Sequence, residues 1–136
     1  MEKVILGHSG NLVLDVDTAD RDHRGTIEYL TVEADLPSLQ ARLRVYEHNG
    51  FSGLPSFFET LESHWRGWDG ETRYASLEGD FQLAARHDGH IRLSFELNDF
   101  LGSIPWKAAG KLTLDPGEEL STAVEALRQL LTAPRS

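Results

Sequence analysis

The sequence predicts an α+β fold in which one curved antiparallel sheet of about seven or eight strands carries two helices on one face. Short segments of alternating apolar and polar residues are separated by turn-forming residues, which indicates antiparallel strands. The apolar period changes to helical spacing twice, and the second half repeats the order of the first. We therefore expect a single domain, residues 1–136, built from tandem ββββα halves at about 1–69 and 70–136.

The first half begins with a predicted hairpin. Apolar residues alternate over 12–16, a turn-rich segment covers 17–25, and alternation resumes over 27–31. A short strand at 4–6 precedes this hairpin. Sequential strands joined by turns pair antiparallel, so these segments are expected to lie side by side.

A further strand is predicted over Gln40–Glu47, because its apolar and polar residues alternate. The face of the predicted sheet that points away from the helices would carry polar residues from both halves. These are Arg42, Arg44, Tyr46, Arg92, Ser94 and Glu96. One face of an antiparallel sheet is often solvated. This face is therefore either a partner or ligand surface or an ordinary solvated face, and the sequence leaves both open.

The first helix is predicted from one apolar stripe. Its members are spaced i, i+3, i+4, i+7 and i+11, and they are Leu54, Phe57, Phe58, Leu61 and Trp65. A stripe of this kind packs on a sheet, so we expect Phe58, Leu61 and Trp65 to be buried.

The second half repeats this order. Strands are predicted at 73–77, 81–85, 91–95 and Lys107–Leu114. Asp115 then serves as N-cap and Glu118 as the N3 residue of a helix that runs to about Thr132. Its stripe matches that of the first helix at constant offset and consists of Leu120, Val124, Leu127 and Leu131.

Composition narrows the classes of function. The chain has 136 residues, no cysteine and a net charge of −9, from 22 acids and 13 bases. Scattered bases and net acidity argue against nucleic acid and anionic membranes as partners. No signal peptide or membrane span is recognisable, which predicts a cytoplasmic protein. The acidity either keeps the chain soluble or complements a basic partner.

No reactive constellation is recognisable. The pair His87 and His90 lacks a third ligand at metal-binding spacing, and Ser52 lacks the flanking glycines of a nucleophile elbow. We therefore expect no catalytic residues, no cofactor and no metal.

The segment His64-Trp65-Arg66-Gly67-Trp68-Asp69-Gly70 is the most distinctive one. Trp68 follows Gly67 and falls outside the helical stripe. Either Trp68 is a hydrophobic lid over the sheet edge, in a turn that Arg66 and Asp69 secure by charge-assisted hydrogen bonds, or Trp68 and Arg66 are exposed anchors for a partner. The candidate partner-binding residues are Arg66, Trp68, Asp69, Tyr46 and Arg44.

Three motifs resemble a family of short bacterial proteins catalogued as a domain of unknown function. They are W-R-G-W-x-G at residues 65–70, S-L-E-G at 76–79 and H-D-G at 87–89. Acidic families of this size include immunity proteins that neutralise bacterial toxins. We therefore expect a non-enzymatic domain that binds a protein partner, for example a basic toxin. The alternatives are a homodimeric structural or regulatory module, and a small-ligand binder or cryptic enzyme with a pocket between helices and sheet.

Overall fold

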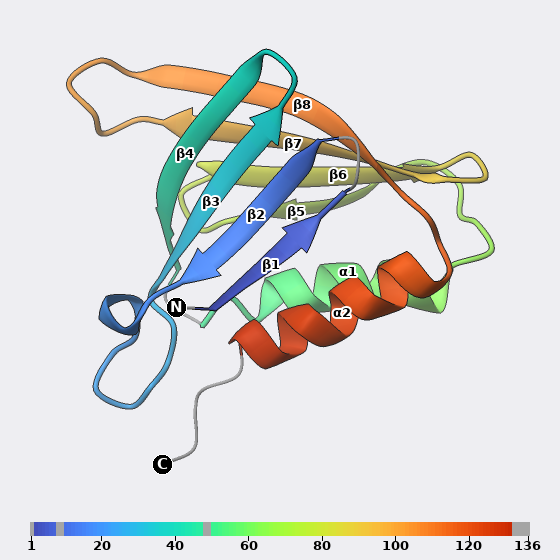
Figure 1. Cartoon of the computed structure of the whole chain (residues 1–136), viewed down its shortest axis with the longest axis horizontal. Coiled ribbons are helices and arrows are strands. Elements are labelled where there is room, and N and C mark those ends of the chain that lie inside the picture. Colours follow the sequence, from blue (N-terminus) through green and yellow to red (C-terminus); the bar gives the residue numbers. More distant parts are fainter. Residues whose placement is uncertain (1, 8–9, 48–49, 132–136) are drawn as a thin grey trace.

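The computed structural model describes residues 2–7, 10–47 and 50–131. Within these residues the chain forms eight strands and two helices in the order ββββα, ββββα, with a short 3-10 helix η1 (Thr18–Asp20) after the second strand (Figure 1). The elements are β1 (Glu2–Leu6), β2 (Asn11–Val16), β3 (Tyr29–Leu36), β4 (Leu39–Tyr46), α1 (Gly53–Ser63), β5 (Thr72–Ala75), β6 (Phe81–His87), β7 (Ile91–Asp99), β8 (Trp106–Leu114) and α2 (Glu118–Leu131).

The α+β class and the antiparallel pairing are confirmed, but the strands form two sheets rather than one. Their orders are β1-β2-β3-β4 and β5-β6-β7-β8. Within each sheet the paired strands follow one another along the chain, as in the pairing of Leu14 with Val32 between β2 and β3. Helix α1 separates β4 from β5, so these two strands are not joined by a hairpin turn and do not pair.

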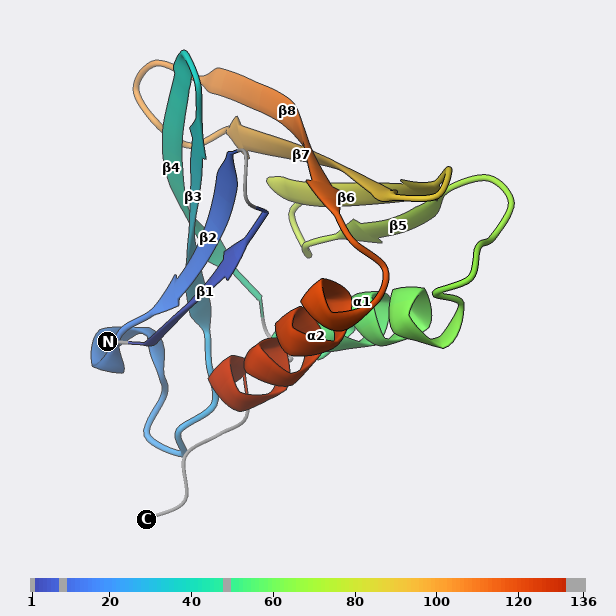
Figure 2. The ribbon, with the colours of Figure 1, turned by 45° about the vertical axis from the view of Figure 1, so that its right-hand side comes forward.

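The two sheets approach each other through Leu36 of β3 and Gly110 of β8. A Cβ atom at Gly110 would lie 3.1 Å from Leu36 Cδ2 and 2.8 Å from Phe95 Cζ, so a side chain there would collide with both. Figure 2 shows the sheets diverging, with α1 and α2 side by side across the open side. Arg128 of α2 and Glu59 of α1 join the helices, with Nε 2.7 Å from Oε2.

One hydrophobic cluster fills the space between the sheets and the helices. Phe58, Leu61, Val124 and Leu127 are all buried in it, as predicted from the two apolar stripes. The helices complete this cluster with Leu54, Phe57, Phe58 and Leu61 from α1 and Leu120, Ala123, Val124, Leu127 and Leu130 from α2.

The predicted burial of Trp65 is wrong, because α1 ends before this residue. The C-cap is His64, whose backbone N–H and ring Nδ1 both donate to the carbonyl of Thr60, at 3.3 and 3.0 Å. The chain then turns at Gly67, whose φ is 142°. Trp65 therefore leaves the helical stripe, and 48% of it is exposed.

Helix α2 begins at Glu118, three residues after the predicted N-cap. The backbone N–H of Asp115 donates to Glu119 Oε1 at 2.7 Å, so the carboxylate that reaches back belongs to Glu119 and not to Glu118. The carboxylate of Asp115 instead accepts a hydrogen bond from His90. The predicted helix end at Thr132 lies outside the described residues.

Candidate partner-binding surfaces

Arg44 and Tyr46, two of the candidate binding residues, are held against other residues of the chain. The Arg44 guanidinium lies 3.8 Å from the ring centroid of Tyr29 and donates to the buried Asp20, with Nη2 2.8 Å from Oδ1. The Tyr46 ring lies 5.4 Å from that of Tyr29. Asp20 belongs to η1, so this cluster fixes η1 beside β4.

Trp68 packs against β6. Its ring is half buried, its indole Nε1 donates to the Ala85 carbonyl at 3.3 Å, and its ring meets that of His87 edge to face at 5.2 Å. These contacts support the lid interpretation of Trp68. They also bring the first and third sequence motifs together, because His87 begins the H-D-G segment.

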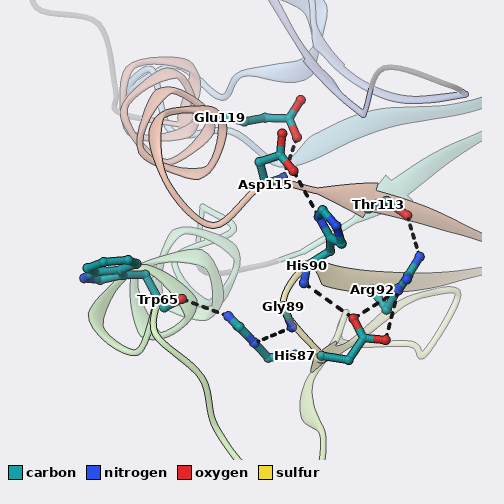
Figure 3. A network of polar contacts seen from close by, with 9 residues as sticks. Trp65, His87, Gly89, His90, Arg92, Thr113, Asp115 and Glu119 are labelled. Carbon is teal, nitrogen blue, oxygen red and sulfur yellow. Dashed lines mark hydrogen bonds and ion pairs between the residues drawn. The ribbon is translucent and has the colours of Figure 1, made fainter.

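Figure 3 shows how His87 fastens the end of α1 to the β6–β7 turn. Its Nε2 donates to the Trp65 carbonyl at 2.8 Å, and its Nδ1 accepts from the Gly89 N–H at 3.2 Å. A ring that donates through Nε2 and accepts through Nδ1 is the neutral Nε2–H tautomer. The ring of His90 turns to Asp115 instead, at 3.1 Å, so the two imidazoles have separate partners.

Arg66 and Asp69 are both exposed. Among the described residues neither side chain makes a hydrogen bond or ion pair, so the expectation that they secure the turn in this way is wrong. The Arg66 guanidinium lies 5.1 Å from the centroid of the Trp65 ring instead. Figure 1 places this α1–β5 loop at the opposite side of the molecule from the end of β4 that carries Arg44, so the structure does not gather the predicted site residues into one site.

The S-L-E-G motif shapes the turn between β5 and β6. The Ser76 hydroxyl accepts the Phe81 N–H at 3.0 Å, and the buried Glu47 carboxylate accepts the Leu77 N–H at 3.1 Å. Burial, together with the nearby Glu47 charge, raises the pKa of the Tyr74 phenol above its ordinary value. The hydrogen bonds of Ser76 and Glu47 hold the turn between β5 and β6 in place.

The most exposed apolar group lies in the loop between β7 and β8, residues 100–105, which we call the β7–β8 loop. Phe100, Leu101 and Ile104 are 58%, 98% and 80% exposed. Asp99 Oδ1 accepts the N–H groups of Leu101 and Gly102, at 3.1 and 2.8 Å, so the first turn of the loop is held by these two hydrogen bonds. Figure 1 shows it projecting beyond the sheet. The sequence signal for this surface is three large apolar residues in a turn segment, which the search for periodic patterns does not single out.

The described residues also line hollows on other parts of the surface. An open hollow of about 350 Å³ lies on β5–β8, where Arg73, Ser94 and Lys111 contribute to its lining. A larger groove of about 690 Å³ runs between the edge strand β1 and α2, with the half-exposed Ile5 on one side and Ala126 on the other.

The fold and these surfaces define a two-sheet α+β domain with an exposed apolar loop. The chain belongs to the family of unknown function DUF6228, whose model matches residues 7–134. No curated protein and no solved structure matches the chain significantly. Among the described residues, no helix has the length and apolar character needed to cross a membrane.

Proposed function

We propose that this chain is a protein-binding domain that engages its partner through the β7–β8 loop. The observation that carries the proposal is the exposure of Phe100, Leu101 and Ile104 on a loop that Asp99 holds in place. Full burial of one such side chain is worth about 1.5–3 kcal/mol. A loop that is already ordered loses little conformational entropy on binding, so more of this free energy would appear as affinity.

Exposed apolar side chains that gather in one place are typical of interaction sites, whereas single ones are common on any surface. The three side chains here lie within five consecutive residues of one loop. They are therefore suited to enter a pocket of a partner as a central anchor, surrounded by polar contacts.

A second candidate keeps the expected basic, toxin-like partner and places it on the helices. The outward residues of α1 and α2 include Glu59, Glu62, Glu118 and Glu125, whereas Arg128 is the basic residue of the two helices. An acidic layer of this kind would accelerate encounter with a basic surface. Toxin neutralisation would be one form of such binding.

Site-specific photo-crosslinking in living cells separates these candidates. A photoreactive phenylalanine analogue replaces Leu101 in one variant and Ser121, exposed on α2, in the other. We expect one discrete protein adduct from position 101 and its loss when Phe100 and Ile104 are both changed to serine, with the melting temperature unchanged.

Each other outcome has a definite meaning. An adduct from position 121 alone favours the acidic helix layer. An adduct at twice the mass of the chain identifies the homodimer. If position 101 yields no adduct, or if the double serine variant leaves the adduct intact, the β7–β8 loop is not the binding site.

A further inference from the structure

The outer face of the β5–β8 sheet concentrates positive charge in an acidic chain. We define this face by the outward residues of its strands, which are Arg73, Ala75, Gln82, Ala84, Arg86, Arg92, Ser94, Glu96, Lys107, Ala109, Lys111 and Thr113. It holds five of the 13 basic residues, and the acids that pair with them are Glu71, Asp88 and Glu96. These five bases are scattered along the sequence because they come from four different strands.

Small side chains hollow out the middle of this face. Strand pairing aligns Arg73 with Ala84, Ala84 with Ser94, and Ser94 with Lys111 in one row across the four strands. Ala109 lies beside this row and lines the same hollow of about 350 Å³. The row therefore has a cation at each end and a shallow floor between them.

The ion pairs on this outer face do not neutralise all of its positive charge. Glu71 contacts both Arg73 and Arg86, and Glu96 lies 3.3 Å from Lys107 Nζ. Within the described chain, no carboxylate pairs with Lys111. One carboxylate shared by two guanidinium groups, together with an ammonium group facing solvent, gives this face an attraction for anions at short range.

We propose that the hollow on the outer face of β5–β8 binds an acidic segment of the protein partner, with carboxylates meeting Arg73 and Lys111. This inference rests on the proposed function and adds the chemistry of the partner. The β7–β8 loop joins the two strands that carry Ser94 and Lys111, so the apolar anchor lies at one end of the sheet whose outer face holds the hollow. A partner held by the loop would lie over this face.

An extended peptide fits the spacing of the two cations. Adjacent strands lie about 4.8 Å apart, so the strands carrying Arg73 and Lys111 are separated by about 14 Å. In an extended chain at about 3.3 Å per residue, side chains at i and i+4 lie about 13 Å apart and on the same face. The expected segment therefore has acidic residues four positions apart with small residues between them.

A small free anion fits this site less well. The hollow is open, and Arg73 and Lys111 are exposed, so each contact with a single anion is weakened by water. Two carboxylates on one segment bind more tightly than two separate anions, because the translational freedom of only one molecule is lost. Nucleic acid would also meet the repulsion of a chain with net charge −9.

To test this proposal, the 136-residue protein is titrated with a fluorescein-labelled peptide that contains Glu-Ala-Ser-Ala-Glu. The fluorescein signal gives the affinity, and the backbone amide signals in NMR locate the bound peptide on the protein. Peptide with the glutamates adjacent, inorganic phosphate and a single-stranded DNA oligonucleotide are the comparison probes. We expect amide shifts at Ala84, Ser94 and Ala109, and weaker binding as salt rises from 50 to ~300 mM.

Charge reversal supplies the matched variants. Arg73→Glu with Lys111→Glu should weaken peptide binding by roughly tenfold or more, the sum of two exposed charge contacts of up to ~1 kcal/mol each. Lys3→Glu, an exposed base on the edge strand of the other sheet, should change it less than about twofold. Neither change touches the β7–β8 loop.

The inference is overturned if Lys3→Glu and the double reversal act alike, or if the shifts fall outside the hollow. Equal amide shifts with inorganic phosphate would show that the hollow is a small-anion site instead. Tighter binding of the DNA oligonucleotide would show that it is a nucleic-acid site. Tighter binding of the peptide with adjacent glutamates would refute the expected spacing of four positions between the acidic residues. Crosslinking from position 101 that persists through the double reversal would leave the proposed function standing while this inference fails.

Discussion

Trp68→Ala should destabilise the protein more than Trp65→Ala, although helical spacing alone assigns Trp65 to the core. Trp68 is half buried and hydrogen-bonded to the Ala85 carbonyl. Full truncation of a buried aromatic costs about 3–5 kcal/mol. A partly buried ring loses less than a fully buried one, and the loss includes the contact with His87 and the hydrogen bond to Ala85. We expect a loss of about 2 kcal/mol in the free energy of unfolding.

Trp65→Ala is the matched control, because it removes the same side chain three residues earlier. Its ring is 48% exposed and contacts Arg66, an interaction worth about 0.5–1 kcal/mol at an exposed site. We expect a loss below ~1 kcal/mol. The His87 hydrogen bond should survive, because it uses the backbone carbonyl of residue 65.

Urea unfolding followed by circular dichroism gives both free energies, and thermal melts should show a fall of roughly 6–8 °C for Trp68→Ala. An equal or larger loss for Trp65→Ala would refute the assignment of Trp68 as the packed ring. A stable Trp68→Ala protein that also forms its adduct through position 101 would remove this motif from both the structural and the functional argument.

Three further outcomes are expected. Phe58→Ala should lower the free energy of unfolding by about 3–5 kcal/mol in urea melts, because Phe58 is fully buried; an unchanged midpoint would show that the α1 stripe faces elsewhere. Gly110→Ala should cost about 1–3 kcal/mol, because its Cβ would lie 2.8 Å from Phe95 Cζ in the same sheet and 3.1 Å from Leu36 Cδ2 in the other; a neutral result would contradict the tight packing of Phe95 and Leu36 at Gly110. The amide of Asn98 donates to Glu96 and lowers the pKa of this carboxyl, so its contribution to stability is present above the ordinary glutamate pKa and is lost as pH falls through the lowered value. An NMR titration of Glu96 at or above the ordinary pKa would contradict this hydrogen bond.

Local patterns were enough to predict the strands and helices. The alternation over 12–16 and the stripe around Phe58 and Leu61 depend on residues within a few positions of one another, and such patterns fix which face of an element is apolar. The order ββββα, ββββα follows from these local periods, and the antiparallel pairing follows from the short connections between consecutive strands. The resemblance to a family of unknown function was also stated from the sequence, and the chain belongs to such a family. The structure adds that two of the three motifs are in contact, because Trp68 packs on His87.

Periodicity could not locate the end of α1. Trp65 has the right spacing for the stripe, but the hydrogen bonds from His64 to Thr60 and the turn at Gly67 end the helix first. Likewise, the carboxylate that caps α2 is Glu119, one residue beyond the predicted position. Both depend on competition between nearby hydrogen-bonding groups, which spacing does not describe.

The sequence by itself determined the class of fold, the family and the buried stripes of the two helices apart from Trp65, because these depend on residues close together in the chain. Only the tertiary structure decided that the strands divide into two sheets, since α1 separates β4 from β5. It also decided the candidate surfaces. The cationic face exists because strand register aligns Arg73 on β5 with Lys111 on β8, residues 38 positions apart whose proximity no local pattern encodes.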